Sequence, residues 1–318
     1  MIECRKNIKI SVLMSVYNET RCQIEMAIDS VLKQTFKELE LIIVNDNPDS
    51  EEIEDILNKI RIKDDRVIII KNDKNVGLAI SLNKAANIAK GDIFARMDAD
   101  DISDYNRFEK EYAYIESGYD LVTTGFHYIN ENAKDIDGKI VYYSKKMVGD
   151  LLPYGNTIHH PTTMMTRKIF EKAGGYRNFP CAQDYDLWLR MYEKGAKIFM
   201  INEDLFAYRV RSQSITESKR IKQIATMQYI RKLYHERQKK GVDSYSLSDY
   251  EEYLRKRKVN TDGDRIYELY KEGREVKKKS FIKKMIYFIK ISFTCPFLIR
   301  MYIDKVKFVV RKKILGRQ

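Results

Sequence analysis

Over the first third of the chain, runs of branched aliphatic residues alternate with segments whose apolar residues recur at helical spacing. This alternation restricts the possible folds more than any other feature of the sequence. Four segments have the composition of buried strands: Ile8–Val16, Leu39–Val44, Arg66–Ile70 and Asp92–Met97. Between them, apolar residues recur at helical spacing, as at Ile24, Ala27, Ile28, Val31 and Leu32. Strands separated by helices of this length predict an α/β fold with a mostly parallel, doubly wound sheet.

Polar clusters follow three of these strand candidates. They are Tyr17-Asn18-Glu19, Asn45-Asp46 and the acidic run from Asp98 to Asp101. In an open parallel sheet, ligands bind in the crevice beyond the carboxyl ends of the strands. We therefore expect one crevice that is lined with carboxylates.

Phosphate groups in this crevice would need a counter-charge other than a glycine-rich loop. Ile8–Ile28 contains no glycine, which excludes a Rossmann fingerprint, and the chain has no Walker motif. Asp98 and Asp100 can offer oxygens to one hard cation, Mg²⁺ or Mn²⁺, which commonly bridges phosphates. Acidic residues after a strand can instead cap the next helix and face solvent.

Several blocks carry a resemblance to a known family. Asp98-Ala-Asp-Asp-Ile-Ser, followed by Arg107, resembles the DxD segment of glycosyltransferase family 2, and Ile10–Glu19 and Leu41–Asp46 resemble its first two strands. The later blocks are similar at His160-Pro-Thr-Thr, Gly174-Gly-Tyr and Gln183–Arg190. The resemblance covers about residues 7 to 216. It implies a glycosyltransferase A-type fold, a nucleoside-diphosphate-sugar donor and inversion at the anomeric carbon.

The resemblance also implies roles for individual residues. The donor base and ribose would be held by Val16, Tyr17, Asn18, Glu19 and Asp46, with Asp46 accepting from the uracil N–H. Asp98 would lie near the ribose and the metal, Asp100 would ligate the metal, and Asp184 would be the general base. The acceptor would be bound by His160, Gly175, Tyr176 and Trp188, although core packing is an alternative for Trp188.

Chemistry independently favours a carboxylate such as Asp184 as the base. Inversion in one step requires that the acceptor hydroxyl is deprotonated as it attacks, and one positioned carboxylate can do this. Asp184 could also be a helix N-cap, and Asp186 is an alternative base. Arg211 stands where related chains often carry a histidine near the metal, and its planar fork suits the donor diphosphate.

The net charge of +12 is confined to the end of the chain. From Val276 to Gln318 there are 13 lysines and arginines against the single acidic residue Asp304, so the rest is neutral. Phe281, Ile282, Met285, Ile286, Ile289 and Phe293 share one helical face. Basic amphipathic helices favour anionic membrane surfaces. One alternative is that the tail packs as a helical cap or dimer face. Nucleic-acid binding is a second alternative, which we do not expect.

These patterns predict three regions. Residues 1–216 form the catalytic domain, 217–275 a helical extension with a linker, and 276–318 the membrane-docking tail. The first residues lack the apolar segment of a secretory signal, and Cys4, Cys22, Cys181 and Cys295 form no CxxC pair. We expect a cytoplasmic, peripherally membrane-associated bacterial enzyme that transfers a UDP-hexose or UDP-N-acetylhexosamine sugar to a lipid-linked saccharide in surface polysaccharide synthesis. A nucleotidyltransferase and a non-catalytic nucleotide-sugar-binding module are the competing functions.

Overall fold

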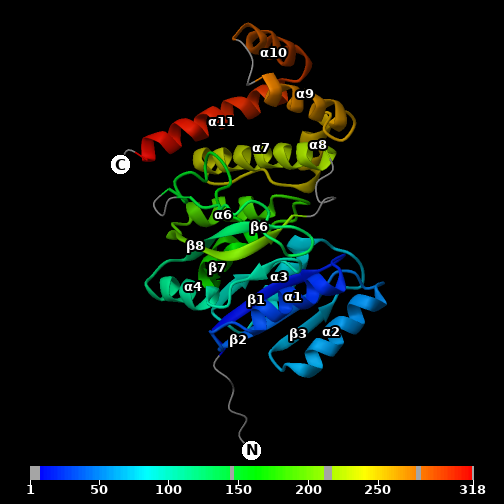
Figure 1. Cartoon of the computed structure of the whole chain (residues 1–318). Coiled ribbons are helices and arrows are strands. Elements are labelled where there is room, and N and C mark those ends of the chain that lie inside the picture. Colours follow the sequence, from blue (N-terminus) through cyan, green and yellow to red (C-terminus); the bar gives the residue numbers. More distant parts are fainter. Residues whose placement is uncertain (1–7, 144–146, 211–216, 277–280, 317–318) are drawn as a thin grey trace, which may run out of the picture. The chain divides into compact units, whose positions relative to one another are not determined.

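The chain forms two compact units in the computed structural model (Figure 1), which describes residues 8–143, 147–210, 217–276 and 281–316. Unit 1 comprises Met1–Asp150 and Thr157–Arg211, and unit 2 comprises Leu151–Asn156 and Ser212–Gln318. Each unit has its own buried core.

Unit 1 is built on an eight-stranded sheet in the order β3-β2-β1-β4-β7-β6-β8-β5. The strands are β1 (Ile10–Val16), β2 (Leu39–Asn45), β3 (Val67–Lys71), β4 (Ile93–Arg96), β5 (Ile102–Ser103), β6 (Leu121–Ile129), β7 (Thr163–Thr166) and β8 (Ile198–Arg209). The four strands from β3 to β4 are parallel, as predicted. Beyond β4 the sheet is mixed, because β7 runs antiparallel to both β4 and β6.

Helices cover both faces of the parallel half of the sheet. The helices of unit 1 are α1 (Arg21–Leu32), α2 (Glu51–Lys63), α3 (Leu78–Ile88), α4 (Arg107–Glu116), α5 (Arg167–Ala173) and α6 (Gln183–Glu193), with a short 3₁₀ turn at His160–Thr162. Ile10, Val12 and Met14 share one core with α1 and α2, whereas α3 contacts β1 and β2 outside that core. Because β2 is buried along its whole length, its sequence is an apolar run apart from Glu40 and the final residue, Asn45.

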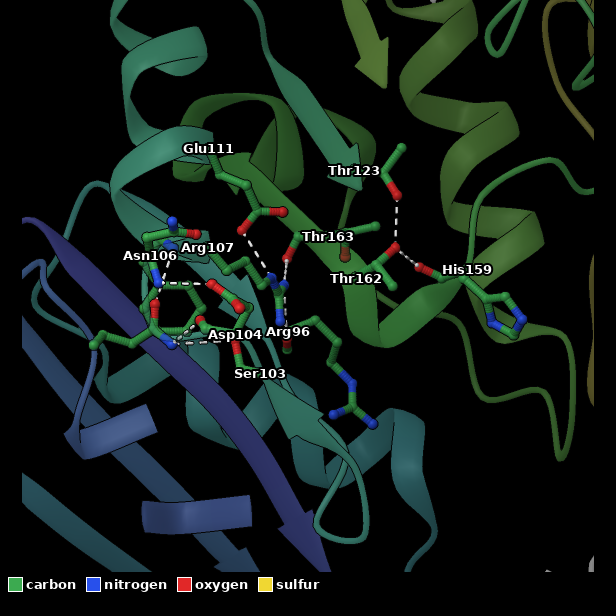
Figure 2. A network of polar contacts seen from close by, with 12 residues as sticks. Arg96, Ser103, Asp104, Asn106, Arg107, Glu111, Thr123, His159, Thr162 and Thr163 are labelled. Carbon is green, nitrogen blue, oxygen red and sulfur yellow. Dashed lines mark hydrogen bonds and ion pairs between the residues drawn. The ribbon is translucent and has the colours of Figure 1, made fainter. Parts of the chain in front are cut away.

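Helix α4 contains a buried ion pair, whose residues are labelled in Figure 2. Arg107 and Glu111 are completely buried, and Arg107 Nε donates to Glu111 Oε2 at 3.0 Å. Arg107 Nη2 also donates to the carbonyl oxygens of Arg96 (3.2 Å) and Thr163 (3.3 Å). These bonds tie the end of β4 to the start of β7. Burial raises the pKa of Glu111 to about 8, against the opposing effect of Arg107.

Unit 2 consists of helices, as the sequence predicts for this part of the chain. They are α7 (Glu217–Lys240), α8 (Leu247–Lys256), α9 (Gly263–Val276), α10 (Phe281–Thr294) and α11 (Pro296–Leu315). The two tail helices pack against each other, α10 also contacts α9, and α11 contacts α7. Tyr287, Ile291 and Leu298 are buried in this packing. Within the described ranges, no helix is both long and apolar enough to cross a bilayer.

We predict that Arg107→Met lowers the free energy of unfolding by about 3–5 kcal/mol, because it leaves the Glu111 carboxylate buried without its counter-charge. Arg107→Met combined with Glu111→Leu should recover much of that loss, because the pair is then replaced by apolar groups of similar volume. Urea denaturation of the single and double variants measures both values. A single variant within about 1 kcal/mol of the parent would contradict the role given to this pair.

Candidate active site

The loops that follow β1 and β2 are joined by hydrogen bonds at one edge of the sheet. The amide of Asp46 donates to the carbonyl of Val16 at 2.8 Å, and Asn47 Nδ2 donates to the carbonyl of Tyr17 at 2.7 Å. Tyr17 and Asn18 are exposed, and Glu19 Oε2 accepts from the Tyr17 amide at 2.8 Å. The structure therefore brings together the two predicted donor-binding loops.

The carboxylate of Asp46 organises the neighbouring loop. Its Oδ1 accepts from Asn72 Nδ2 (2.8 Å) and from the Val76 amide (2.9 Å), and its Oδ2 accepts from the Gly77 amide (2.9 Å). Asp46 is buried, so these three donors offset the cost of removing its charge from water. A carboxylate has about four acceptor positions, which leaves one for the predicted uracil N–H.

The acidic run after β4 is held by two arginines that come from strand ends. Arg96, itself buried, donates through Nη2 to Asp98 Oδ1. Arg209, at the end of β8, donates from its amide to Asp101 Oδ1 at 2.7 Å and from Nε to the Asp100 carbonyl at 2.5 Å. The side chains of Asp98 and Asp100 remain partly exposed, and Asp101 is buried beneath them.

The neighbouring carboxylates of this acidic loop act on one another. Burial, followed by the charges of Asp98 and Asp100, raises the pKa of Asp101 well above its ordinary value. Asp101 Oδ2 is buried, and among the described residues it has no hydrogen-bond partner. No three acidic, histidine or cysteine side chains in the described ranges converge as a complete metal cage would. A Mg²⁺ ion commonly needs only one or two carboxylates when phosphates complete its coordination, and Asp98 and Asp100 fit that donor set.

A second wall of the site is formed by aromatic and imidazole side chains. His160 Nε2 and the Tyr176 hydroxyl lie 2.8 Å apart in a hydrogen bond, and both side chains are buried. Burial, followed by the charges of Asp184 and Asp98, raises the pKa of Tyr176 above its ordinary value. Burial lowers the pKa of His159 to about 4, although the charge of Asp98 opposes this shift. His159 is therefore neutral at pH 7.

The start of α6 rules out the alternative role of Asp184 as the helix N-cap. Its N-cap is Ala182, held at φ 57°, so Asp184 is the second residue of the helix and does not cap it. Asp184 is partly exposed, whereas Asp186 is buried and accepts from Arg190 at 2.8 and 2.9 Å. Asp186 is thus a structural ion-pair partner. A non-glycine residue at positive φ costs about 1–3 kcal/mol, and such strain clusters at functional sites.

The predicted acceptor residues do not all face solvent. Trp188 is 0% exposed, and its ring centroid lies 6.0 Å from that of His160. Trp188 is therefore a core residue, as the alternative stated, and the prediction that it contacts the acceptor is wrong. The sequence cannot distinguish these roles, because α6 is buried at most positions from Tyr185 to Met191. Gly175 contributes its backbone, and its carbonyl accepts from Arg190 Nη2 at 2.8 Å.

Two of the arginines in this site were missed by the sequence analysis, which singled out Arg211 instead. Arg211 lies outside the described residues. Arg209, two positions earlier, is buried and holds the acidic loop, and its Nη1 also donates to the carbonyls of Asn130 and Glu131. One sequence feature could have indicated these arginines, namely a charged residue within an apolar strand, as at Arg96 in Ile93-Phe-Ala-Arg-Met. A buried charge needs a partner, so such a residue is expected to hold a neighbouring group.

The fold agrees with comparisons to known proteins. Glycosyl transferase family 2 matches residues 11–174, and the chain belongs to this family. The O-antigen biosynthesis glycosyltransferase WbnJ of Escherichia coli is 36% identical over 213 residues, which cover 66% of this chain and 82% of WbnJ. WfaP of E. coli, a UDP-Glc:alpha-D-GlcNAc-diphosphoundecaprenol beta-1,3-glucosyltransferase, is 30% identical over 213 residues, which cover 66% of this chain and 80% of WfaP.

A solved structure has a similar fold. Residues 1–349 of S. aureus TarS, in complex with UDP-GlcNAc, align with a TM-score of 0.56 and 16% identity, covering 78% of this chain and 70% of that one. The chain spans 42% of the longer TarS structure. The predicted glycosyltransferase A-type fold is thereby confirmed.

Gly175 allows a test of how Tyr176 is held. Its φ is 65°, and a Cβ there would lie 2.9 Å from Asn83 Oδ1, the atom that accepts from the Tyr176 amide at 2.9 Å. We predict that Gly175→Ala costs about 2–5 kcal/mol of stability, from backbone strain plus steric conflict. Gly195→Ala is the matched control, because Gly195 has φ 83° with open space around it, so strain alone should appear. Chemical denaturation of both variants measures the difference, and equal losses would contradict the steric conflict.

Proposed function

We propose that this protein is an inverting glycosyltransferase that moves a sugar from a UDP-hexose or UDP-N-acetylhexosamine to a lipid-linked saccharide in surface polysaccharide synthesis. The observation that carries the proposal is the placement of Asp46, Asp98 and Asp100 directly after the parallel strands β2 and β4, together with a further, partly exposed carboxylate, Asp184, in the first turn of α6. WfaP uses a diphosphoundecaprenol-linked acceptor by its name, and the TarS structure of similar fold holds UDP-GlcNAc. A nucleotidyltransferase would require a glycine-rich loop after β1, and none is present between Ile8 and Ile28.

The acidic loop would bind the donor through a divalent metal. Asp98 and Asp100 would hold Mn²⁺ or Mg²⁺, with donor phosphate oxygens completing the coordination. The metal supplies a Lewis acid that neutralises charge on the departing diphosphate. Arg96 orients Asp98, and Arg209 orients the backbone of Asp100 and the side chain of Asp101. The loop would therefore be ordered before the metal binds, which lowers the cost of assembling the site.

The second acidic group would deprotonate the acceptor. Asp184 is partly exposed in the first turn of α6, and Asp186 is removed from this role by its ion pair with Arg190. The carboxylate would accept the proton of the attacking hydroxyl as the new glycosidic bond forms and the bond to the UDP leaving group breaks. Inversion follows because attack and departure occur on opposite faces of the anomeric carbon.

The tail would bring the enzyme to the membrane that contains its acceptor. One face of α10 is exposed and apolar, through Ile282, Met285, Ile286, Ile289 and Phe293. The opposite face is buried at Tyr287 and Ile291, so the same helix has a core face and a free face. The exposed lysines Lys283 and Lys290 belong to the same helix, and a lysine near an anionic surface contributes about 1 kcal/mol of attraction.

We predict that Asp100→Asn abolishes metal-dependent hydrolysis of a UDP-sugar while the melting temperature changes little, because Asp100 is partly exposed. Calorimetric titration should show a lower affinity for UDP in the presence of Mn²⁺ in the variant than in the parent. Without metal, UDP should bind the parent and the variant with the same affinity. Unchanged hydrolysis by the parent enzyme in excess EDTA would exclude the metal mechanism.

We predict that Asp184→Asn lowers kcat by about 100-fold or more, the contribution of a positioned general base. UDP affinity in the presence of Mn²⁺ should stay at the parental value, because the residue would contact the acceptor and not the nucleotide. Initial rates over a range of acceptor concentrations, together with calorimetric UDP titrations, separate the two effects. A normal kcat with weakened UDP binding would reassign Asp184 to donor binding.

We predict that Ile286→Ser combined with Phe293→Ser reduces binding to anionic vesicles at least about tenfold, since each buried apolar side chain contributes about 1.5–3 kcal/mol. Phe293 is 85% exposed, so its replacement should leave unit 2 folded. Removing the whole tail would be a poorer test, because it would expose the core around Ile291 and Leu298.

Vesicle flotation measures this binding, and Ile62→Ser on α2, where Ile62 is 81% exposed, is the matched control. The control should float like the parent, and high salt should weaken flotation of both. If the parent protein does not float with anionic vesicles at low salt, the docking role of the tail is wrong.

A further inference from the structure

A cavity in unit 2 has the composition of an anion-binding site and is not used by the function proposed above. Its volume is about 580 Å³, and its lining comes from α7, from the end of α8 through the first turns of α9, and from the junction of α10 and α11. Five cationic side chains line it, Lys256, Arg257, Lys258, Arg265 and Arg300, against the single carboxylate of Asp262. We call it the basic cavity. It lies outside residues 11–174, which the family match covers.

Most of this positive charge is not neutralised by the protein. Lys256 pairs with Glu252 at 2.9 Å. The other four cations form no ion pair with a carboxylate in the described part of the chain. Burial, and then the charge of Arg300, lowers the pKa of Arg257, whose guanidinium lies 3.4 Å from the centre of the Tyr253 ring. Cations that repel one another around a cavity are stabilised by a bound anion.

A buried amide in the lining indicates a specific ligand. Gln228 is 2% exposed, and neither its Nε2 nor its Oε1 has a hydrogen-bond partner among the described residues. A buried polar group without a partner costs about 1–3 kcal/mol. Phosphate oxygens would accept from Gln228 Nε2 and recover this cost.

The starts of two helices add to the positive potential. The cavity is lined by Cys295, Pro296 and Phe297, where the 20-residue helix α11 begins, and by Asp262 and Arg265, where α9 begins. Backbone N–H groups and the helix dipole favour anions at such positions.

The exposed apolar face of α10 leads to the rim of the same cavity. Phe293 directly precedes Thr294, which lines the cavity, and Ile289 and Ile286 lie on the exposed face one and two turns earlier. An amphiphile with an anionic head and an apolar chain matches this arrangement. We propose that the basic cavity binds the diphosphate of a lipid-linked saccharide acceptor, an inference that rests on the lipid-linked acceptor of the proposed function.

Inorganic pyrophosphate is the simplest probe, titrated calorimetrically into the full-length protein in EDTA so that a metal-dependent donor site does not contribute. Arg265→Gln should raise the dissociation constant about tenfold or more, as expected for a lost hydrogen bond between charged groups. Arg274→Gln is the matched control, because Arg274 is an exposed cation of the same helix outside the cavity. It should bind like the parent.

Gln228→Leu gives a second readout that a purely structural residue would not show. The substitution removes a buried unpartnered amide, so the melting temperature should rise while pyrophosphate affinity falls. No pyrophosphate binding by the parent, or equal binding by the parent, Arg265→Gln and Gln228→Leu, would overturn the proposal. UDP-sugar hydrolysis should be unaffected in both variants, so failure of this inference and failure of the proposed transferase activity are distinguishable.

Vesicles distinguish a diphosphate from surface charge alone. The parent should bind more tightly to phosphatidylcholine vesicles that contain undecaprenyl diphosphate than to vesicles of equal charge that contain phosphatidylglycerol. Arg265→Gln should lose this preference, and Arg274→Gln should keep it. Equal binding of the parent to both vesicles would overturn recognition of the diphosphate.

Discussion

The parallel pairing of β1 with β2 and β4 is the constraint on which the candidate site depends. Val16 pairs with Asn45, and Leu13 pairs with Arg96, so the loops after these strands emerge at one edge of the sheet. That edge collects carboxylates, and carboxylates close together repel one another. The chain counters this with Arg96, with Arg209 and with the donors around Asp46. We propose that the partly exposed carboxylates of Asp98 and Asp100 are the groups at this edge that would bind a divalent cation.

The part of the fold set by local periodicity was predictable from the sequence. The strands from β1 to β4 and the helices between them follow the apolar pattern, and parallel pairing then determines where Tyr17, Asp46 and Asp98 must lie. The mixed half of the sheet was not predictable in this way, because the order β7-β6-β8-β5 depends on long-range pairing. The family resemblance indicated which residues of this mixed half are important for function, but it did not indicate which residues they contact.

Individual roles required the tertiary structure. Arg107 belongs to a sequence motif, but the motif does not predict its ion pair with Glu111 or its hydrogen bonds to two strands. These contacts depend on how α4 packs in the folded chain. Ala182 caps α6 in a conformation that propensity would not assign to alanine, and this moves Asp184 into the helix. Trp188 and the tail show the same limit, since apolar residues at helical spacing do not indicate whether a face is covered. In α10, Ile291 is buried and Ile286 is exposed.

The most direct measurement of the central claim is anomalous diffraction from crystals of the full-length protein grown with UDP and Mn²⁺. The account predicts one strong manganese peak within about 2.3 Å of a carboxylate oxygen of Asp100, with UDP phosphate oxygens on its other side and the Asp184 carboxylate facing them without ligating the metal. Nucleotide bound in the crevice with no manganese at the Asp98–Asp101 loop, or manganese held by Asp184, would contradict it.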